Sequence, residues 1–199
     1  MPKSYKFTIA ITSSLLIVLV MYLGAYLPLR KSQLYINALI KIQTKQIHSV
    51  EDFTEAFNPA LSYYSPIGQD EVVSYFIGGV LADLINQQTN PQVIEVLMKD
   101  SEQWTDPIIR AGKGFGYSQN LYNFAALYQL AAQKLKNADY FQKSFELFFK
   151  GLENSPNREI FLNGLFNNYQ IAGDKAKAKE IGEIILKYWP GERRYKKSD

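Results

Sequence analysis

The pattern of apolar and polar positions divides the chain into one long apolar segment followed by a series of helical segments. Residues 7–29, FTIAITSSLLIVLVMYLGAYLPL, carry no charged side chain over 23 positions. A helix rises about 1.5 Å per residue, so this segment is long enough to cross the roughly 30 Å hydrocarbon core of a bilayer. We therefore predict a transmembrane helix over residues 7–29, preceded by a short basic tail over residues 1–6.

A cleaved signal peptide is the alternative interpretation of this segment. Its apolar region would usually be about 7 to 15 residues long and would end in a small-x-small cleavage site. The run here is longer, and the GAYLPLRK sequence that closes it contains no convincing site. We therefore favour an uncleaved anchor in the lipid bilayer, with Tyr22 and Tyr26 placed where aromatic residues mark the membrane interface.

Charges on the two sides of the span give conflicting signals about orientation. Lys3 and Lys6 in the N-terminal tail favour a cytoplasmic N-terminus and an extracytoplasmic helical domain. Four basic residues lie within about 20 residues of the other end of the span, where the positive-inside rule favours the cytoplasm; they are Arg30, Lys31, Lys41 and Lys45. We expect a single-pass protein whose helical domain is extracytoplasmic. A cytoplasmic helical domain is the alternative.

Residues 32–110 are predicted to be helical with degenerate repeats, because glycine and proline separate segments of helical periodicity and no two-residue alternation is sustained. The first segment covers residues 34–47. The second starts near Ser49, where SVED has the form of a capping box, and runs to about Tyr63. Two further helices are predicted over residues 71–86, as a buried core helix, and residues 89–104, with Thr89 or Asn90 as the cap.

Three glycines alternate in RAGKGFGYSQN, residues 110–120, which raises the question of a phosphate-binding loop. Such a loop needs a strand before the glycines and a helix after them. Here a helix end, a turn and a short apolar segment precede the glycines, and no Gly-Lys-Ser/Thr sequence follows. We interpret this loop as a joint between helices.

The last third of the chain contains a repeat. Pro156 and Pro190 lie 34 residues apart, and each closes an apolar helix. This period is typical of tetratricopeptide (TPR) repeats, and residues 159–192 resemble one closely. The resemblance rests on Leu162, Leu165 and Tyr169 in the first helix, Gly173-Asp174 at the turn and Ala178 at the helix crossing.

The unit before it matches the TPR pattern more loosely, so that residues 117–192 form two TPR-like repeats. It has about seven extra residues, which predicts a longer first helix because these would add about two helical turns. The resemblance implies an all-α fold, a right-handed α-solenoid after the transmembrane helix. An earlier, degenerate unit is predicted over residues 33–66.

TPR arrays bind partners on the concave side, which the first helix of each repeat lines. The resemblance therefore implies a protein-binding groove whose candidate residues are Tyr122, Gln129, Asn163, Asn167 and Gln170. The last three lie at i, i+4 and i+7 on one helical face, and their amides can both donate to and accept from an extended peptide. A merely solvated polar face is the alternative.

A second resemblance covers the apolar span ending LPLRKSQLYINAL, the SVEDFTEAFNPALSYYSPIGQDE segment and the ALYQLA and GDKAKAKEI sequences. Together they resemble the TPR-like tail and last span of bacterial O-antigen ligase or polymerase-like membrane proteins. This resemblance implies a bacterial cell membrane and a role in envelope polysaccharide assembly. The family's activity does not carry over, because no catalytic position of the family has a counterpart here.

Composition excludes several classes of site. The net charge is +3, there is no cysteine and His48 is the only histidine. We therefore predict no nucleic-acid binding, no metal site, no cofactor and no catalytic residue.

Glu51, Asp52 and Glu55 resemble paired carboxylates, but their place in the first turn of a helix favours capping. The basic C-terminal tail over residues 193–199 is either frayed or in contact with anionic lipid.

The function that these features favour is a membrane-anchored scaffold for protein-protein interaction, not an enzyme. One alternative is an accessory or tail fragment of a glycan ligase or polymerase. Another is a structural module that forms homo-oligomers. That module would use apolar residues left open at the end of the array, namely Ile181, Ile184, Ile185 and Tyr188.

Overall fold

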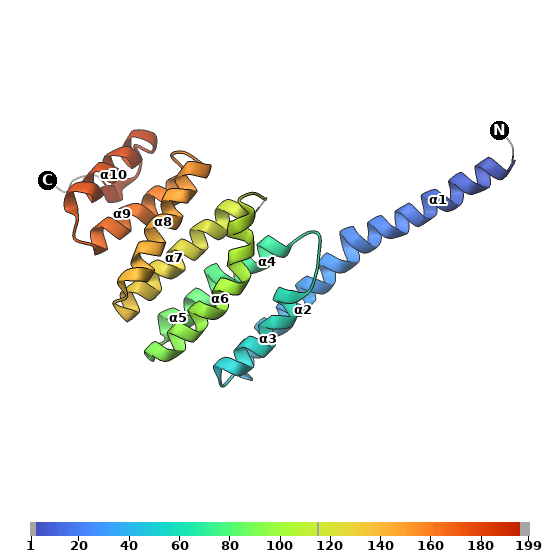
Figure 1. Cartoon of the computed structure of the whole chain (residues 1–199), viewed down its shortest axis with the longest axis horizontal. Helices are drawn as coiled ribbons and strands as arrows, with labels where there is room; N and C mark the ends of the chain where they lie inside the picture. The colour runs from blue at the N-terminus through green and yellow to red at the C-terminus, as the bar shows by residue number, and fades with distance from the viewer. Residues whose placement is uncertain (1–2, 115, 196–199) are drawn as a thin grey trace. The chain divides into compact units, whose positions relative to one another are not determined.

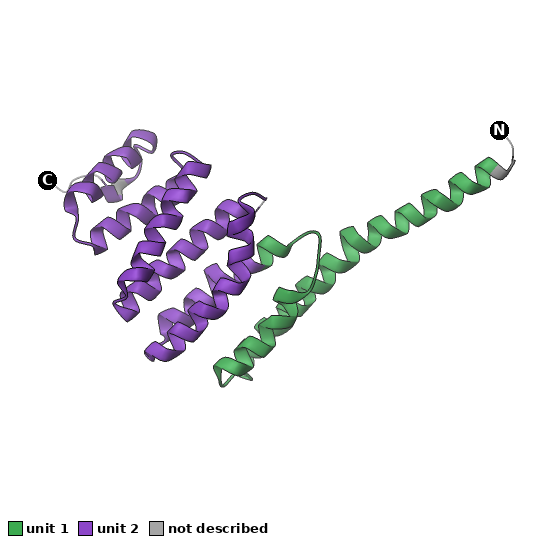
Figure 2. Ribbon diagram, viewed as in Figure 1, with its two compact units in different colours: residues 1–72 green, residues 73–199 purple. Residues whose placement is uncertain are grey.

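The computed structural model describes residues 3–114 and 116–195, and all regular elements within these ranges are helices (Figure 1). The prediction of an all-helical protein is therefore confirmed for the described residues. The chain forms two compact units, Met1–Val72 and Val73–Asp199 (Figure 2). Of the basic C-terminal tail, residues 196–199 lie outside the described part.

The first unit begins with a long helix that continues well beyond the apolar segment. It consists of α1 (Lys3–Met21), a π-helical turn η1 (Tyr22–Tyr26) and α2 (Leu27–Gln43). The prediction of a separate helix over residues 34–47 was wrong. The widened turn explains the continuity: the Leu27 N–H donates to the Tyr22 carbonyl five residues earlier, and Pro28 lies in the first turn of α2 without interrupting it.

Helix α3 (Val50–Ser62) begins with the predicted capping box. The Asp52 N–H donates to Ser49 Oγ over 3.0 Å, and the Asp52 carboxylate accepts from the N–H groups of His48 and Ser49 at 2.9 and 3.1 Å. These bonds, the one from His48 foremost, lower the pKa of Asp52 below its usual value. The capping interpretation of this carboxylate is confirmed, while Glu51 and Glu55 are exposed.

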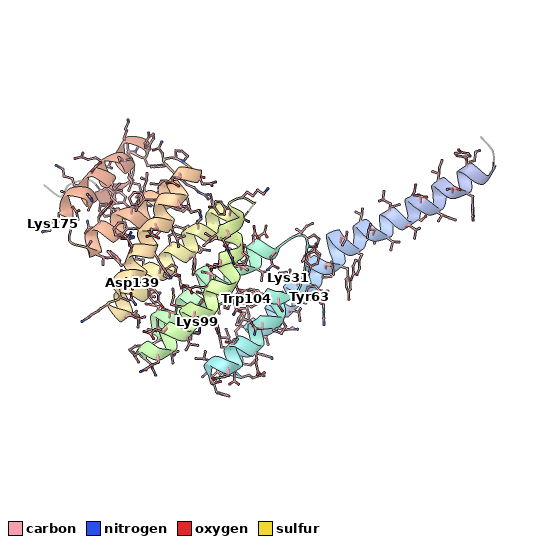
Figure 3. The ribbon with its side chains drawn as sticks, in the orientation of Figure 1. Lys31, Tyr63, Lys99, Trp104, Asp139 and Lys175 are labelled. Carbon is pink, nitrogen blue, oxygen red and sulfur yellow. The ribbon has the colours of Figure 1, made fainter. Side chains whose placement is uncertain are left out.

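Helices α2 and α3 pack as an antiparallel pair. The rings of Tyr35 and Phe57 meet edge to face with centroids 5.7 Å apart. About one turn further along α3, Lys31 Nζ donates to the Ala60 carbonyl over 2.6 Å and to the Tyr63 carbonyl over 2.7 Å (Figure 3). Lys31 is only 1% exposed, and its side chain satisfies carbonyl groups at the C-terminal end of α3.

The second helical stretch, α4 (Gln69–Tyr75), η2 (Phe76–Leu81) and α5 (Ala82–Gln87), contains the predicted core helix. Helix α6 (Pro91–Ala111) follows with Asn90 as its cap, because the Asn90 side chain accepts from the Gln92 N–H over 3.0 Å. We expected this helix to end before Pro107, which was wrong. It runs on to Gly112, whose φ of +67° is the left-handed conformation that ends helices.

Two helical hairpins complete the second unit: α7 (Tyr117–Leu135) with α8 (Ala138–Asn154), and α9 (Glu159–Ile171) with α10 (Lys175–Tyr188). A short 3₁₀ turn, η3 (Arg193–Tyr195), ends the described chain. The predicted longer first helix is confirmed, since α7 has 19 residues and α9 has 13. The predicted turn between α9 and α10 is confirmed as well. Gly173 has φ +74°, and the Asp174 side chain accepts from the Lys177 N–H.

Two glycines let α8 and α9 approach closely. A Cβ atom added to Gly151 on α8 would lie 2.2 Å from the Phe161 ring of α9. Conversely, a Cβ atom on Gly164 of α9 would lie 2.3 Å from the Phe148 ring of α8. Each phenyl ring therefore occupies the space that a larger residue would fill on the opposite helix, and both rings are almost fully buried.

Apolar side chains on α8 and α10 are only partly covered by neighbouring helices. Helical spacing predicts core positions for the four phenylalanines of α8, yet only Phe148 is fully buried and Phe149 is 43% exposed. Of the four apolar residues on α10 that a homo-oligomeric module would use, Ile185 is completely buried, Ile181 and Ile184 are half-buried, and Tyr188 is 46% exposed. Helical spacing places residues on a face, but the width of the covered part depends on the neighbouring helices.

Candidate functional site

The predicted groove residues lie on two helices that contact each other. Tyr122 and Gln129 belong to α7, and Asn163, Asn167 and Gln170 belong to α9. Helix α7 also contacts α5, η2, α6 and α8, which makes it the central helix of the second unit. The candidate site is therefore built on the most heavily packed part of that unit.

Tyr122 and Gln129 are half-buried and take part in packing between helices. The Tyr122 ring lies 6.2 Å from the ring of Phe148 and 6.4 Å from that of Phe161. Gln129 Nε2 donates to Asn168 Oδ1 over 2.6 Å. Both side chains therefore hold α7 against its neighbours.

Asn163 is half-buried and is contacted by the C-terminal turn η3. Its amide donates to Glu159 Oε1 over 3.3 Å, and its carbonyl oxygen accepts from the Tyr195 hydroxyl over 2.5 Å. The Tyr195 ring also packs edge to face on Phe166, with centroids 4.6 Å apart. The chain thus covers this predicted binding residue with its own C-terminal segment.

Asn167 and Gln170 remain as the exposed members of the predicted set. They lie three positions apart on α9, so their side chains share one side of the helix. The structure thus divides the five candidates into three that are engaged by other parts of the chain and two whose side chains reach solvent. An interaction surface on α9 would have to be centred on these two amides.

The structure also shows a buried polar network that the sequence did not indicate. Asn168 on α9 is completely buried, and its amide donates to Ser144 Oγ of α8 over 3.0 Å. Ser144 Oγ in turn donates to the Ala125 carbonyl of α7 over 2.9 Å. With the bond from Gln129, this network joins three helices. An asparagine beside Asn167 looks like surface in the sequence, and only the packing of α9 buries it.

We predict that Asn168→Leu destabilises the second unit by about 1–3 kcal/mol, because it removes the bonds that the buried Asn168 amide makes with Gln129 and Ser144. Asn167→Leu is the matched control, since the neighbouring side chain is exposed and should change stability little. The free energy of unfolding of both variants is measured by urea unfolding of the full chain in detergent, with the fluorescence of Trp104 and Trp189 as the signal. Equal stability of the two variants would contradict the role given to the network.

A second cluster joins α6, α7 and α8 through charged and aromatic groups. The Tyr128 hydroxyl donates to Glu102, and Lys143 Nζ lies 3.2 Å from the same carboxylate and 5.1 Å from the centre of the Tyr128 ring. Burial, together with the bond to Glu102, raises the pKa of Tyr128 above its usual value. The phenol therefore keeps its proton, and through its bond to Glu102 it links α7 to α6.

Among the described residues, no group of three or more histidine, aspartate or glutamate side chains could hold a metal ion. His48, the only histidine, lies beside the α3 cap, where its backbone N–H is used. The chain matches no protein-family model, no curated protein and no solved structure.

Proposed function

We propose that this protein is a single-pass membrane scaffold whose TPR-like helical hairpins bind a segment of a protein partner. The observation that carries the proposal is the exposure of the apolar helix. Each residue from Leu15 to Met21 is apolar and 51–66% exposed. These positions cover more than one full helical turn, so none of the described residues covers any side of this stretch of the helix.

An apolar helix exposed on all sides is unfavourable in water, because each Å² of apolar surface costs about 25 cal/mol there. A bilayer removes that cost and satisfies the backbone through the helix itself. The apolar segment belongs to one continuous helix, of which residues Tyr5–Gln43 are long and apolar enough to cross a membrane. Because α2 extends this helix and packs on α3, cleavage after the apolar segment would cut through a continuous element, which supports an anchor over a signal peptide.

The packing of the second unit supports the repeat interpretation. In a TPR array the first helix of each repeat packs on both helices of the previous one. Here α9 contacts α7 and α8, and α7 contacts α6 as well as the η2–α5 stretch. This pattern is consistent with successive hairpins stacked in one direction, the right-handed α-solenoid that the sequence resemblance implies.

The proposed binding surface is the exposed side of α9 that carries Asn167 and Gln170. These amides suit the alternating donors and acceptors of an extended peptide backbone. Anchoring raises the effective concentration of this surface for partners in the same membrane, so weak contacts suffice. The resemblance to O-antigen ligase and polymerase tails suggests bacterial envelope polysaccharide assembly as the setting, with the helical domain outside the cytoplasm.

We expect a photocrosslinking residue at position 167 to capture one discrete partner in cells. A probe at Glu183 on the exposed surface of α10 is the control and should not capture the same protein. Mass spectrometry identifies the bands, and the known compartment of the partner assigns the side of the membrane. Capture of the chain itself alone, or equal labelling from both probes, would contradict the partner-binding proposal and favour a homo-oligomeric module.

A further inference from the structure

The loop between α3 and α4, residues 63–68, is held beside the end of the apolar segment. Lys31 follows Leu29, the last residue of that segment, by two positions. Its Nζ binds the carbonyl oxygens of Ala60 and Tyr63, so the C-terminal end of α3 is fixed at this level of the long helix (Figure 3). Because a helical side chain leans toward the N-terminus, this contact is displaced toward the span.

The direction of α3 carries the loop toward the apolar segment. Along the antiparallel pair, Tyr35 packs on Phe57 and Lys31 binds Ala60, so moving forward along α3 means moving back along α2. Tyr64 comes directly after Tyr63, whose carbonyl group is the last along the chain that Lys31 contacts. The first residue of the loop beyond Tyr63 thus lies at or past the level where the apolar segment ends.

Internal contacts keep the loop compact at this place. Ser65 is 4% exposed and its hydroxyl donates to the Ile67 carbonyl over 2.5 Å. Gln69 Nε2 donates back to the Leu61 carbonyl over 3.1 Å, and Gly68 makes the turn with φ +83°. The chain therefore enters and leaves the loop at the C-terminal end of α3.

Two large apolar side chains nevertheless project from the loop into solvent: Tyr64 is 72% exposed and Ile67 is 57% exposed. The long helix also carries aromatic residues toward this end of the apolar segment, where Tyr22 and Tyr26 stack with centroids 5.5 Å apart. Tyrosine is favoured at the membrane interface because its ring is apolar and its hydroxyl stays hydrated. A tyrosine and an isoleucine exposed at this level match that environment.

We infer that the loop over residues 63–68 is a second membrane contact, in which Tyr64 and Ile67 insert into the bilayer interface beside the span of the same chain. The inference rests on the proposed membrane anchor. Burial of one tyrosine and one isoleucine in the interface would fix α3 relative to the membrane, so that the α2–α3 hairpin is held at two points. The span alone would leave it free to rotate.

The test uses nitroxide labels, which can be placed at single positions because the chain has no cysteine. Tyr64→Cys and Ile67→Cys report on the loop, and Leu16→Cys reports on the span. Ile40→Cys is the matched control: it is an isoleucine that is 47% exposed on α2. It lies nine residues beyond Lys31, or about 14 Å farther from the span along the helix.

The labelled full chains are reconstituted in vesicles of phosphatidylcholine and phosphatidylglycerol. Collision with oxygen, which concentrates in lipid, is compared with collision with a water-soluble nickel chelate. We expect the labels at positions 64 and 67 to collide several-fold more with oxygen, relative to the chelate, than the label at position 40 does. Their values should lie between those of positions 40 and 16.

Other outcomes separate this inference from the anchor. If positions 64 and 67 match position 40 while position 16 lies in lipid, the second contact is overturned and the anchor stands. If both loop labels are protected from oxygen and chelate alike, the loop is covered by protein, which also overturns the inference. If position 16 collides freely with the chelate, the anchor itself is overturned, and the second contact with it.

Discussion

Replacing Leu16 and Leu19 by arginine is expected to remove the protein from the membrane. The two positions lie near the middle of the apolar segment and are 60% and 51% exposed, so neither charge would meet protein. An arginine at the centre of a membrane helix costs about 2.5–3.5 kcal/mol on insertion scales, so the pair costs roughly twice that amount. Extraction at alkaline pH followed by flotation on a density gradient measures the membrane-bound fraction.

Ser32→Arg with Gln33→Arg is the matched control, because it adds the same charge on exposed positions of the same helix just beyond the apolar segment. We expect this variant to float with the vesicles as the unchanged protein does. The intact mass of the purified protein adds an independent check, since cleavage as a signal peptide would remove the apolar segment. Flotation of the Leu16→Arg, Leu19→Arg variant would contradict a spanning helix.

Gly151→Ala is expected to destabilise the second unit by about 1–3 kcal/mol, the usual cost of overpacking a tight core. The added methyl group would lie 2.2 Å from a carbon of the Phe161 ring, far inside contact distance. The ring is completely buried, so α8 and α9 must move apart to make room. The same reasoning applies to Gly164→Ala and the Phe148 ring, at 2.3 Å. Urea unfolding followed by tryptophan fluorescence reports the change.

The cause of that loss can be tested with a double variant. Phe161→Leu shortens the side chain that faces Gly151, so Gly151→Ala should cost less free energy in the Phe161→Leu background than in the unchanged chain. Gly191→Ala is the control for the substitution itself, because a Cβ atom there would meet no atom within 4 Å. Additive effects of Gly151→Ala and Phe161→Leu would show that the clash is not the reason.

The predicted binding set shows where local reasoning stops. Asn163, Asn167 and Asn168 all lie on one short helix, and as residues they are identical. The structure leaves Asn167 exposed, places Tyr195 on Asn163 and buries Asn168 against Ser144. The spacing of the amides could be read from the sequence. Their accessibility could not, because it depends on segments that return to α9 from elsewhere in the chain.

The sequence by itself determined the features that arise within a few neighbouring residues. The apolar segment, the Ser49–Asp52 capping box and the Gly173–Asp174 turn depend on local composition and on hydrogen bonds to nearby backbone groups. Only the tertiary structure decided that Lys31 is buried at the end of α3, because its partners are carbonyl groups 29 and 32 residues away. Any residue exposes a carbonyl at a helix end, so no side-chain pattern marks such a partner, and the fold alone brings it within reach.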